Sequence, residues 1–143
     1  MDAPIRSVHH INFLVRDLDA AVAQYERVLN KPADSRGTLP DRGVDVARFK
    51  VGETWIVLVN PTRPGTTPAR HLEQHGEGFF LMSLEVDALA EQAQRLGDEA
   101  FAGDARTGLD GWAVRDLDPK GTCGAQLQYV VTTPRKPDVD SNE

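Results

Sequence analysis

The order of predicted elements repeats once along the chain, and this repeat restricts the possible folds more than any other feature. The first half contains a strand, an amphipathic helix and a hairpin, at residues 11–15, 17–29, and 44–51 with 54–59. The second half contains a strand, a helix and two strands, at residues 79–86, 87–99, 111–117 and 125–131. Equivalent positions lie 71 residues apart, as in His10 and Leu81. A unit of this size cannot bury its own apolar face, so the repeat predicts two paired modules.

The chain has room for one domain of this kind. Its 143 residues, 40% of them hydrophobic, suffice for a core that needs no disulfide or structural metal. Two β-α-β-β-β modules, at about 7–62 and 78–132, predict an α+β fold in which eight strands form a cupped mixed sheet, within a single domain over residues 1–132. Residues 133–143 are rich in proline and charge and are predicted to form a disordered tail.

Charge and cysteine content argue against several classes of function. A formal net charge of −6 provides no basic surface for nucleic acid. The mostly apolar run Ile11–Val15 is too short for a signal peptide or a membrane span. Cys123 is the one cysteine, which excludes an internal disulfide and cysteine-based metal clusters and favours a reducing, cytoplasmic location. The expected partner is therefore a small-molecule ligand, with no nucleic acid and no membrane.

Three segments resemble those of a known superfamily, in the same order and at the same spacing. They are HHINFLVRDLDAAVAQYERVL at 9–29, NPTRPGTTPARHLEQHGEGFF at 60–80 and DPKGTCGAQLQYV at 118–130. Over about residues 7–132 the chain resembles the vicinal oxygen chelate superfamily, which has the glyoxalase and bleomycin-resistance fold. Within that superfamily its pattern is most similar to methylmalonyl-CoA epimerase. The resemblance implies the cupped sheet and a homodimer, because relatives commonly bury their open sheet edges in one.

The resemblance also implies a metal site, which the residues of this chain match poorly. Enzymes of the superfamily carry metal ligands, typically His, Gln or Glu, at the equivalents of four positions: His10, Val57, Leu81 and Gln128. The bound cation polarises a substrate carbonyl and stabilises an enolate. Valine and leucine have no lone pairs, and a neutral amide is a weak donor that cannot act as a general base. His10 is the single matching metal candidate, so no cofactor is expected, with a divalent Zn, Co, Ni or Mn ion as the alternative.

Strand alternation predicts which side chains line the cup. His10 and Asn12 alternate with an apolar set that includes Phe13, and the apolar set is expected under the helices. A few polar groups between aromatic walls are typical of small-molecule sites. The predicted ligand-binding residues are His10, Asn12, Arg48, Trp55, Phe79 and Gln128. The alternatives are a structural role for His10, a space-filling role for Trp55 and a solvated position for Arg48.

Two classes of function follow from these observations, and neither assigns a catalytic residue. The first, favoured by the missing donors, is a metal-free protein that binds a small organic molecule in the cup, as in the resistance branch of the superfamily. The second is a metal-dependent isomerase or lyase of the glyoxalase or methylmalonyl-CoA epimerase type, acting through an enolate. Arg63 and Arg70 flank the proline loop and are either solvated or contacts for the phosphates of a coenzyme A-like group.

Overall fold

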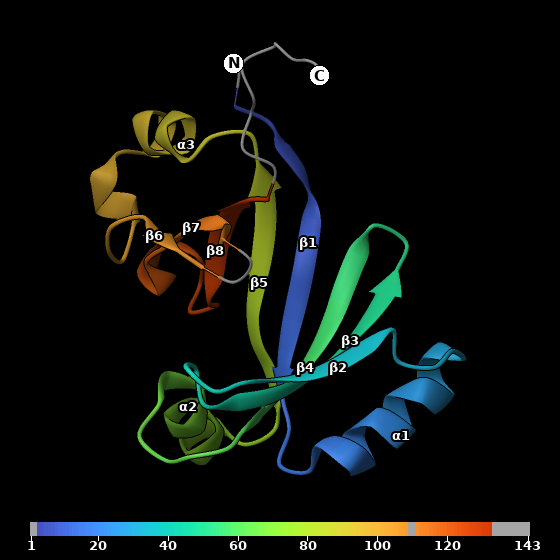
Figure 1. Cartoon of the computed structure of the whole chain (residues 1–143). Helices are drawn as coiled ribbons and strands as arrows, with labels where there is room; N and C mark the ends of the chain where they lie inside the picture. The colour runs from blue at the N-terminus through green and yellow to red at the C-terminus, as the bar shows by residue number, and fades with distance from the viewer. Residues whose placement is uncertain (1–2, 109–110, 133–143) are drawn as a thin grey trace. The chain divides into compact units, whose positions relative to one another are not determined.

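The structure is a computed structural model that describes residues 3–108 and 111–132, and Figure 1 shows its strands and helices. The described elements are, in chain order, β1 Ile5–Leu14, α1 Leu18–Leu29, β2 Ser35–Leu39, β3 Val44–Val51, β4 Thr54–Pro61, α2 Thr67–His75, β5 Gly78–Val86, α3 Leu89–Leu96, β6 Arg106–Thr107, β7 Ala113–Asp116 and β8 Leu127–Val131. Short 3-10 helices lie at Asp98–Ala100 and Pro119–Gly121. The tail predicted at 133–143 lies outside the described residues.

The strands belong to a mixed sheet in the order β2-β3-β4-β1-β5-β8-β7-β6. β1 is parallel to β4, whereas β2 with β3, β3 with β4, β6 with β7 and β7 with β8 are antiparallel pairs. The predicted α+β class with an eight-stranded mixed sheet is therefore confirmed. The sequence analysis located β3 and β4 but not β2, because the residues SRGTL lack an alternating apolar pattern.

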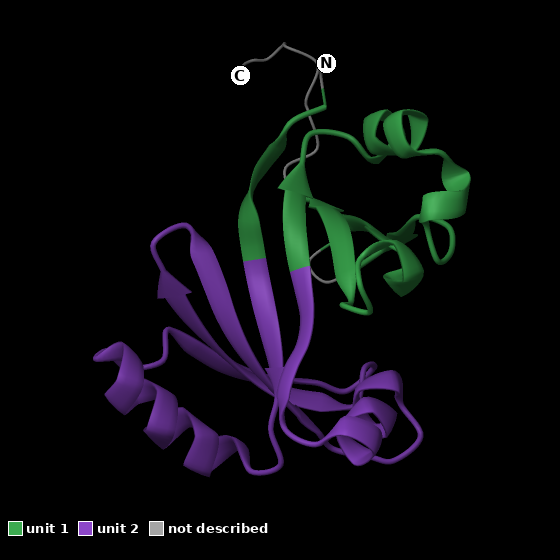
Figure 2. Cartoon of the chain, turned by 180° about the vertical axis from the view of Figure 1, so that it is seen from behind, with its two compact units in different colours: residues 1–9, 83–143 green, residues 10–82 purple. Residues whose placement is uncertain are grey.

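The chain divides into two compact units, which Figure 2 colours separately. Unit 2 contains residues 10–82, and unit 1 contains the described residues of 1–9 and 83–143. β1 and β5 are each divided between the units, so the units do not coincide with the predicted modules at 7–62 and 78–132. The single-domain organisation stays a prediction.

In unit 2, α1 packs on one face of the strands. Asp17 caps the helix by accepting a hydrogen bond from the Ala20 N–H at 3.1 Å, and Asn30 ends it in the left-handed region with φ of 57°. The cluster on this α1 face consists of Val15, Leu18, Ala21, Val22, Ala47, Phe49 and Leu58. A second cluster, on the face opposite α1, consists of Leu14, Val44, Val46, Val57, Val59 and Phe80. Both sides of the unit 2 sheet therefore carry buried apolar side chains.

Unit 1 has a smaller core under α3. Its buried residues are Val86, Phe101, Leu117 and Tyr129. Gln92 of α3 is fully buried, where its Nε2 donates to the Ala3 carbonyl at 2.9 Å and its Oε1 accepts from Arg95. These bonds satisfy the polar atoms of a buried amide, as its burial requires.

The helices within the described ranges are short. The longest, α1, has 12 residues, and none is long and apolar enough to cross a membrane.

Candidate functional site

The face of unit 2 opposite α1 brings together four of the six predicted ligand-binding residues. In the β1–β4 pairing His10 lies beside Trp55, and Asn12 lies beside Val57. In the β3–β4 pairing Arg48 is the partner of the same Val57. Because Leu14, Val46 and Val57 pack on this face, alternation places Asn12, Arg48, His10 and Trp55 on it as well. The predicted parity of β1 and β4 is therefore confirmed.

Phe79 does not join this set, although Leu81 of the same predicted β5 face packs against the cluster opposite α1. Its ring is edge-on to Phe13 at 6.4 Å, and Phe13 packs against the cluster under α1. Phe80 is buried in the cluster opposite α1, where its ring meets His71 of α2 at 4.9 Å. Leu72 of α2 packs against the same cluster.

Two of the four positions that carry metal ligands in superfamily enzymes are part of an apolar cluster here. Val57 is 8% exposed and packs in the cluster with Leu14 and Val59, and Leu81 packs against the same cluster. Hydrocarbon side chains in this position provide neither lone pairs nor charge for a cation. Within residues 3–108 and 111–132, no group of three or more His, Cys, Asp or Glu side chains is placed to hold a metal ion. The donor set therefore does not fit the metal site of the superfamily.

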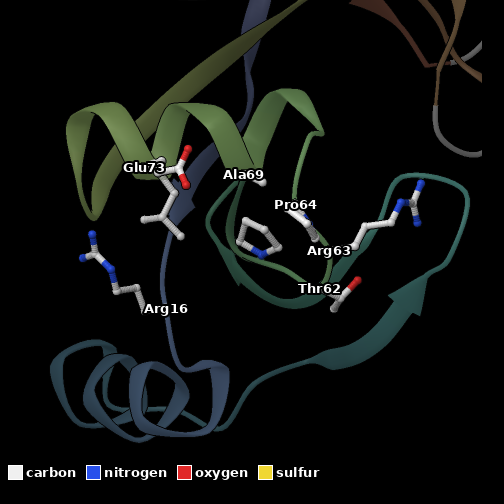
Figure 3. A pocket seen from close by; sticks show the side chains of 8 residues that line it. Arg16, Thr62, Arg63, Pro64, Ala69 and Glu73 are labelled. Carbon is white, nitrogen blue, oxygen red and sulfur yellow. The ribbon is translucent and has the colours of Figure 1, made fainter.

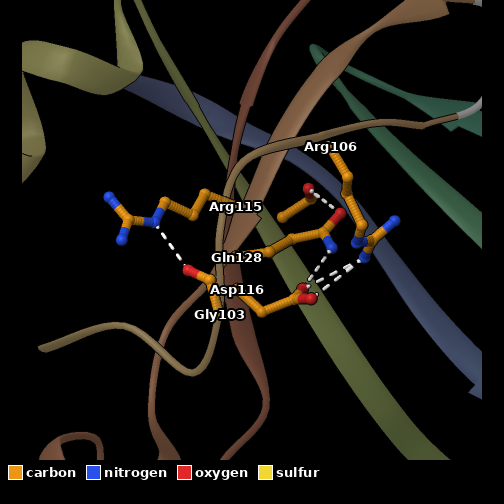
Figure 4. Close-up of polar contacts among 6 residues, drawn as sticks. Gly103, Arg106, Arg115, Asp116 and Gln128 are labelled. Atoms are coloured by element: carbon orange, nitrogen blue, oxygen red, sulfur yellow. Dashed lines mark hydrogen bonds and ion pairs between the residues drawn. The ribbon is translucent and has the colours of Figure 1, made fainter. Parts of the chain in front are cut away.

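The fourth position, Gln128 in unit 1, lies in a polar network that Figure 4 shows. Its Oε1 accepts a hydrogen bond from Ser83 Oγ at 2.7 Å, and its Nε2 donates to Asp116 Oδ1 at 2.9 Å. Asp116 also pairs with Arg106 Nη2 at 3.1 Å. Gln128 is 7% exposed and Ser83 is fully buried. The amide of Gln128 is thus held by neighbouring side chains at both its oxygen and its nitrogen.

Ser83 and Arg106 are members of this network that the sequence analysis did not single out. One signal for Ser83 was present, because it lies 71 positions after Asn12 and so occupies the equivalent place in the repeat. For Arg106 the chain carried no such signal. Its role follows from the β6–β7 pairing, which brings it to the carboxylate of Asp116.

Asn12 and Arg48 carry polar groups that the described part of the chain leaves unpaired. Asn12 Oδ1 is buried without a hydrogen-bond partner. The Arg48 guanidinium likewise forms no hydrogen bond or ion pair with residues 3–108 and 111–132. By contrast, the Lys50 ammonium lies 4.9 Å from the centre of the Trp55 ring. An unpaired buried acceptor destabilises a fold by about 1–3 kcal/mol, so the fold itself gives no reason for an amide at position 12.

A shallow pocket of about 420 Å³ lies between the proline loop and α2. Figure 3 shows its lining side chains, with Arg63 directed away from Glu73. Arg63 donates to the carbonyls of Pro40 and Asp41 at 2.7 and 3.3 Å, and Arg70 donates to the Gly65 carbonyl. Both arginines therefore hold backbone carbonyls of neighbouring loops, a role that neither sequence-based alternative included.

Comparisons with known proteins identify relatives of this chain. The sequence model of the Glyoxalase/Bleomycin resistance protein/Dioxygenase superfamily matches residues 9–118. An ethylmalonyl-CoA/methylmalonyl-CoA epimerase of Cereibacter sphaeroides is 29% identical over 133 residues, covering 88% of this chain and 99% of that protein. The mitochondrial methylmalonyl-CoA epimerase of Homo sapiens is 27% identical over 124 residues, covering 84% of this chain and 70% of that protein.

A solved structure shows the same fold. A variant of the Streptomyces coelicolor methylmalonyl-CoA epimerase, in complex with 2-nitronate-propionyl-CoA, superposes with a TM-score of 0.79 and 23% identity, covering 91% of this chain and 99% of that one. The match to the superfamily model covers most of the chain. The repeat, the strand order and these matches lead to one conclusion: the chain belongs to the glyoxalase/bleomycin resistance protein/dioxygenase superfamily.

Proposed function

We propose that the chain binds a small organic molecule on the face of unit 2 opposite α1, without the metal ion of its enzymatic relatives. The observation that carries this proposal is the contrast between two sets of side chains on that face. Val57 and Leu81 have become part of an apolar cluster, whereas Asn12 and Arg48 keep unpaired polar groups beside it. A few polar groups next to apolar surface suit a ligand better than a hydrated cation.

Each residue of the proposed site has a distinct task. The Arg48 guanidinium is a fixed positive charge for an anionic group of the ligand. The Asn12 carboxamide, which turns about a single bond, offers its oxygen to a donor of the ligand. Trp55 and His10, which are neighbours across β1 and β4, provide ring surfaces for its apolar part. Because the solved relative holds an acyl-CoA analogue, acyl-CoA thioesters are the first ligands to screen.

Asn12→Leu is expected to raise stability and weaken ligand binding at the same time. The variant removes a buried acceptor without a partner, so the free energy of unfolding should rise by about 1 kcal/mol. Asn60→Leu is the matched control, because Asn60 accepts from the Leu18 N–H and donates to the Arg16 and Pro61 carbonyls. The same substitution there should destabilise the chain. Urea unfolding measures the free energy of unfolding of both variants. A loss of stability in Asn12→Leu would show that Asn12 is structural.

Ligand binding itself is measured by the fluorescence of Trp55 in a Trp112→Phe background, which leaves one of the two tryptophans. Ligands are expected to change the emission of Trp55, and Trp55→Ala and Arg48→Ala are expected to weaken binding in calorimetry. Val51→Ala, at an exposed position of β3, is the control. Binding that is unchanged in both Trp55→Ala and Arg48→Ala would contradict the proposed site.

Protein purified without chelator is expected to carry well under one equivalent of divalent metal, because only His10 remains of the superfamily ligands. Elemental analysis of the wild type and of His10→Ala tests this. Stoichiometric Zn, Co, Ni or Mn that is lost in His10→Ala would contradict the proposal. That outcome would favour the second candidate function, a metal-dependent isomerase or lyase acting through an enolate, which the epimerase relatives suggest.

We further propose a cytoplasmic homodimer. β2 lies at one end of the sheet order, and its residues are mostly exposed. An unpaired strand edge is commonly covered by a second copy. The exposed thiol of Cys123 suits a reducing compartment. Light scattering at micromolar concentration should give twice the 15.7 kDa mass of one chain. A mass of one chain would contradict the dimer.

A further inference from the structure

Two histidines lie side by side on α2, outside the proposed ligand site. His71 and His75 are separated by one helical turn, and their ring centres are 4.4 Å apart with the planes tilted by 41°. His75 is exposed and is the last residue of the helix. The His71 ring also meets Phe80 edge-on at 4.9 Å. The imidazole of His71 is thus in contact with a second imidazole and with a buried phenyl ring.

The surroundings of His71 keep its ring in the neutral, metal-binding form. Burial penalises the charged imidazolium and the neighbouring His75 repels it, so the pKa of His71 lies below its ordinary value. Its Nδ1 is buried without a partner, which leaves Nε2 as the nitrogen that can reach a ligand from solvent. Neutral imidazole nitrogens are good ligands for zinc, copper and nickel.

We propose that His71 and His75 form a two-histidine site for a divalent transition-metal ion on the surface of α2. Histidines at positions i and i+4 of a helix point to the same side and can share one metal ion. Metal–nitrogen bonds of about 2.0–2.1 Å place the two donor nitrogens about 3 Å apart. The ring centres of His71 and His75, 4.4 Å apart, already bring the two imidazoles close to this spacing. Water completes the coordination.

This site is distinct from the superfamily metal position, because it contains neither His10 nor any of the three replaced ligands. Two protein ligands hold a metal weakly. We therefore expect the purified protein to contain no metal at α2 and to bind metal there only when the metal is added. Cu²⁺ should bind more tightly than Ni²⁺ or Zn²⁺, following the usual order of these ions. A metal ion bound to both side chains links His75, at the end of α2, to His71, whose ring packs on Phe80. Metal binding should therefore stabilise unit 2.

The test is a titration of the full chain with CuCl₂, NiCl₂ or ZnCl₂ at pH 7.5, followed by calorimetry and thermal unfolding. The melting temperature is expected to rise with metal concentration. Removing a residue that only hydrogen-bonds to a metal ligand weakens metal affinity about 10–100-fold. His75→Ala removes a proposed ligand itself and should therefore weaken metal binding at least about tenfold. His10→Ala is the matched control and should leave the affinity unchanged. Cu²⁺ should also broaden the ring-proton NMR signals of His71 and His75 before those of His9 and His10.

Three outcomes would overturn the site. They are the absence of a metal-induced rise in melting temperature, metal affinity that is unchanged in His75→Ala, and metal affinity that is lost in His10→Ala. The exposed position of His75 makes His75→Ala compatible with folding, and His75→Gln provides a second variant that keeps a polar side chain there. Because the site shares no residue with the proposed ligand site, ligand binding by Trp55 fluorescence should persist in both variants.

Discussion

The double variant Val57→Gln and Leu81→His is expected to lower the free energy of unfolding by about 2–5 kcal/mol in metal-free buffer. It returns donor side chains to two positions that carry metal ligands in superfamily enzymes. In this chain both positions pack against the cluster of Leu14, Val59 and Phe80, so the new amide and imidazole replace hydrocarbon contacts there. Val57 is 8% exposed, so water cannot satisfy the new amide. Urea unfolding followed by circular dichroism measures the loss.

Val51→Gln is the matched control for this variant. Val51 is 43% exposed at the end of β3, and the change there should stay within about 0.5 kcal/mol of the wild type. In the double variant, added Zn²⁺ or Co²⁺ is expected to restore part of the lost stability, because His10 and the two new donors then provide three ligands. A double variant as stable as the wild type in metal-free buffer would show that these positions are not packed as an apolar core.

Gln128→Glu is expected to destabilise the chain by about 2–4 kcal/mol at pH 7, although the two side chains have nearly the same shape. Gln128 Nε2 donates to Asp116 Oδ1 at 2.9 Å. A carboxylate cannot donate, and it would set a second negative charge against Asp116 at a position that is 7% exposed. Thermal unfolding of the variant and the wild type measures the difference.

The loss in Gln128→Glu should depend on pH with a definite sign. Burial and repulsion by Asp116 raise the pKa of the introduced carboxyl in the folded state above its unfolded value. A carboxyl of this kind costs stability at pH values above its unfolded pKa, and the cost disappears as pH falls and the group is protonated. The deficit should therefore shrink between pH 7 and about pH 4. Gln94→Glu, at an exposed position of α3, is the control and should show neither the loss nor this pH dependence.

Much of the architecture was readable from the sequence because it depends on local periodicity. The 71-residue repeat predicted the order of strands and helices. Strand alternation placed His10, Asn12 and Trp55 on one face, which the β1–β4 register confirms. The loss of metal donors at Val57 and Leu81 was also visible, because the identity of a side chain decides whether it has lone pairs.

The tertiary structure decided which of these residues have partners. Alternation alone could not place Phe79 and Phe80, because the neighbours Phe80 and Leu81 both pack at the cluster opposite α1 whereas Phe79 meets Phe13. Gln128 was predicted to bind a ligand, yet Ser83, 45 positions away, and Asp116 hold both its polar atoms. Asn12, with an equally polar amide, has a buried oxygen without any such partner among the described residues. The sequence by itself determined the order of the strands and helices and the chemistry of each side chain. Hydrogen bonding depends on positions in space, which only the folding of the chain brings together.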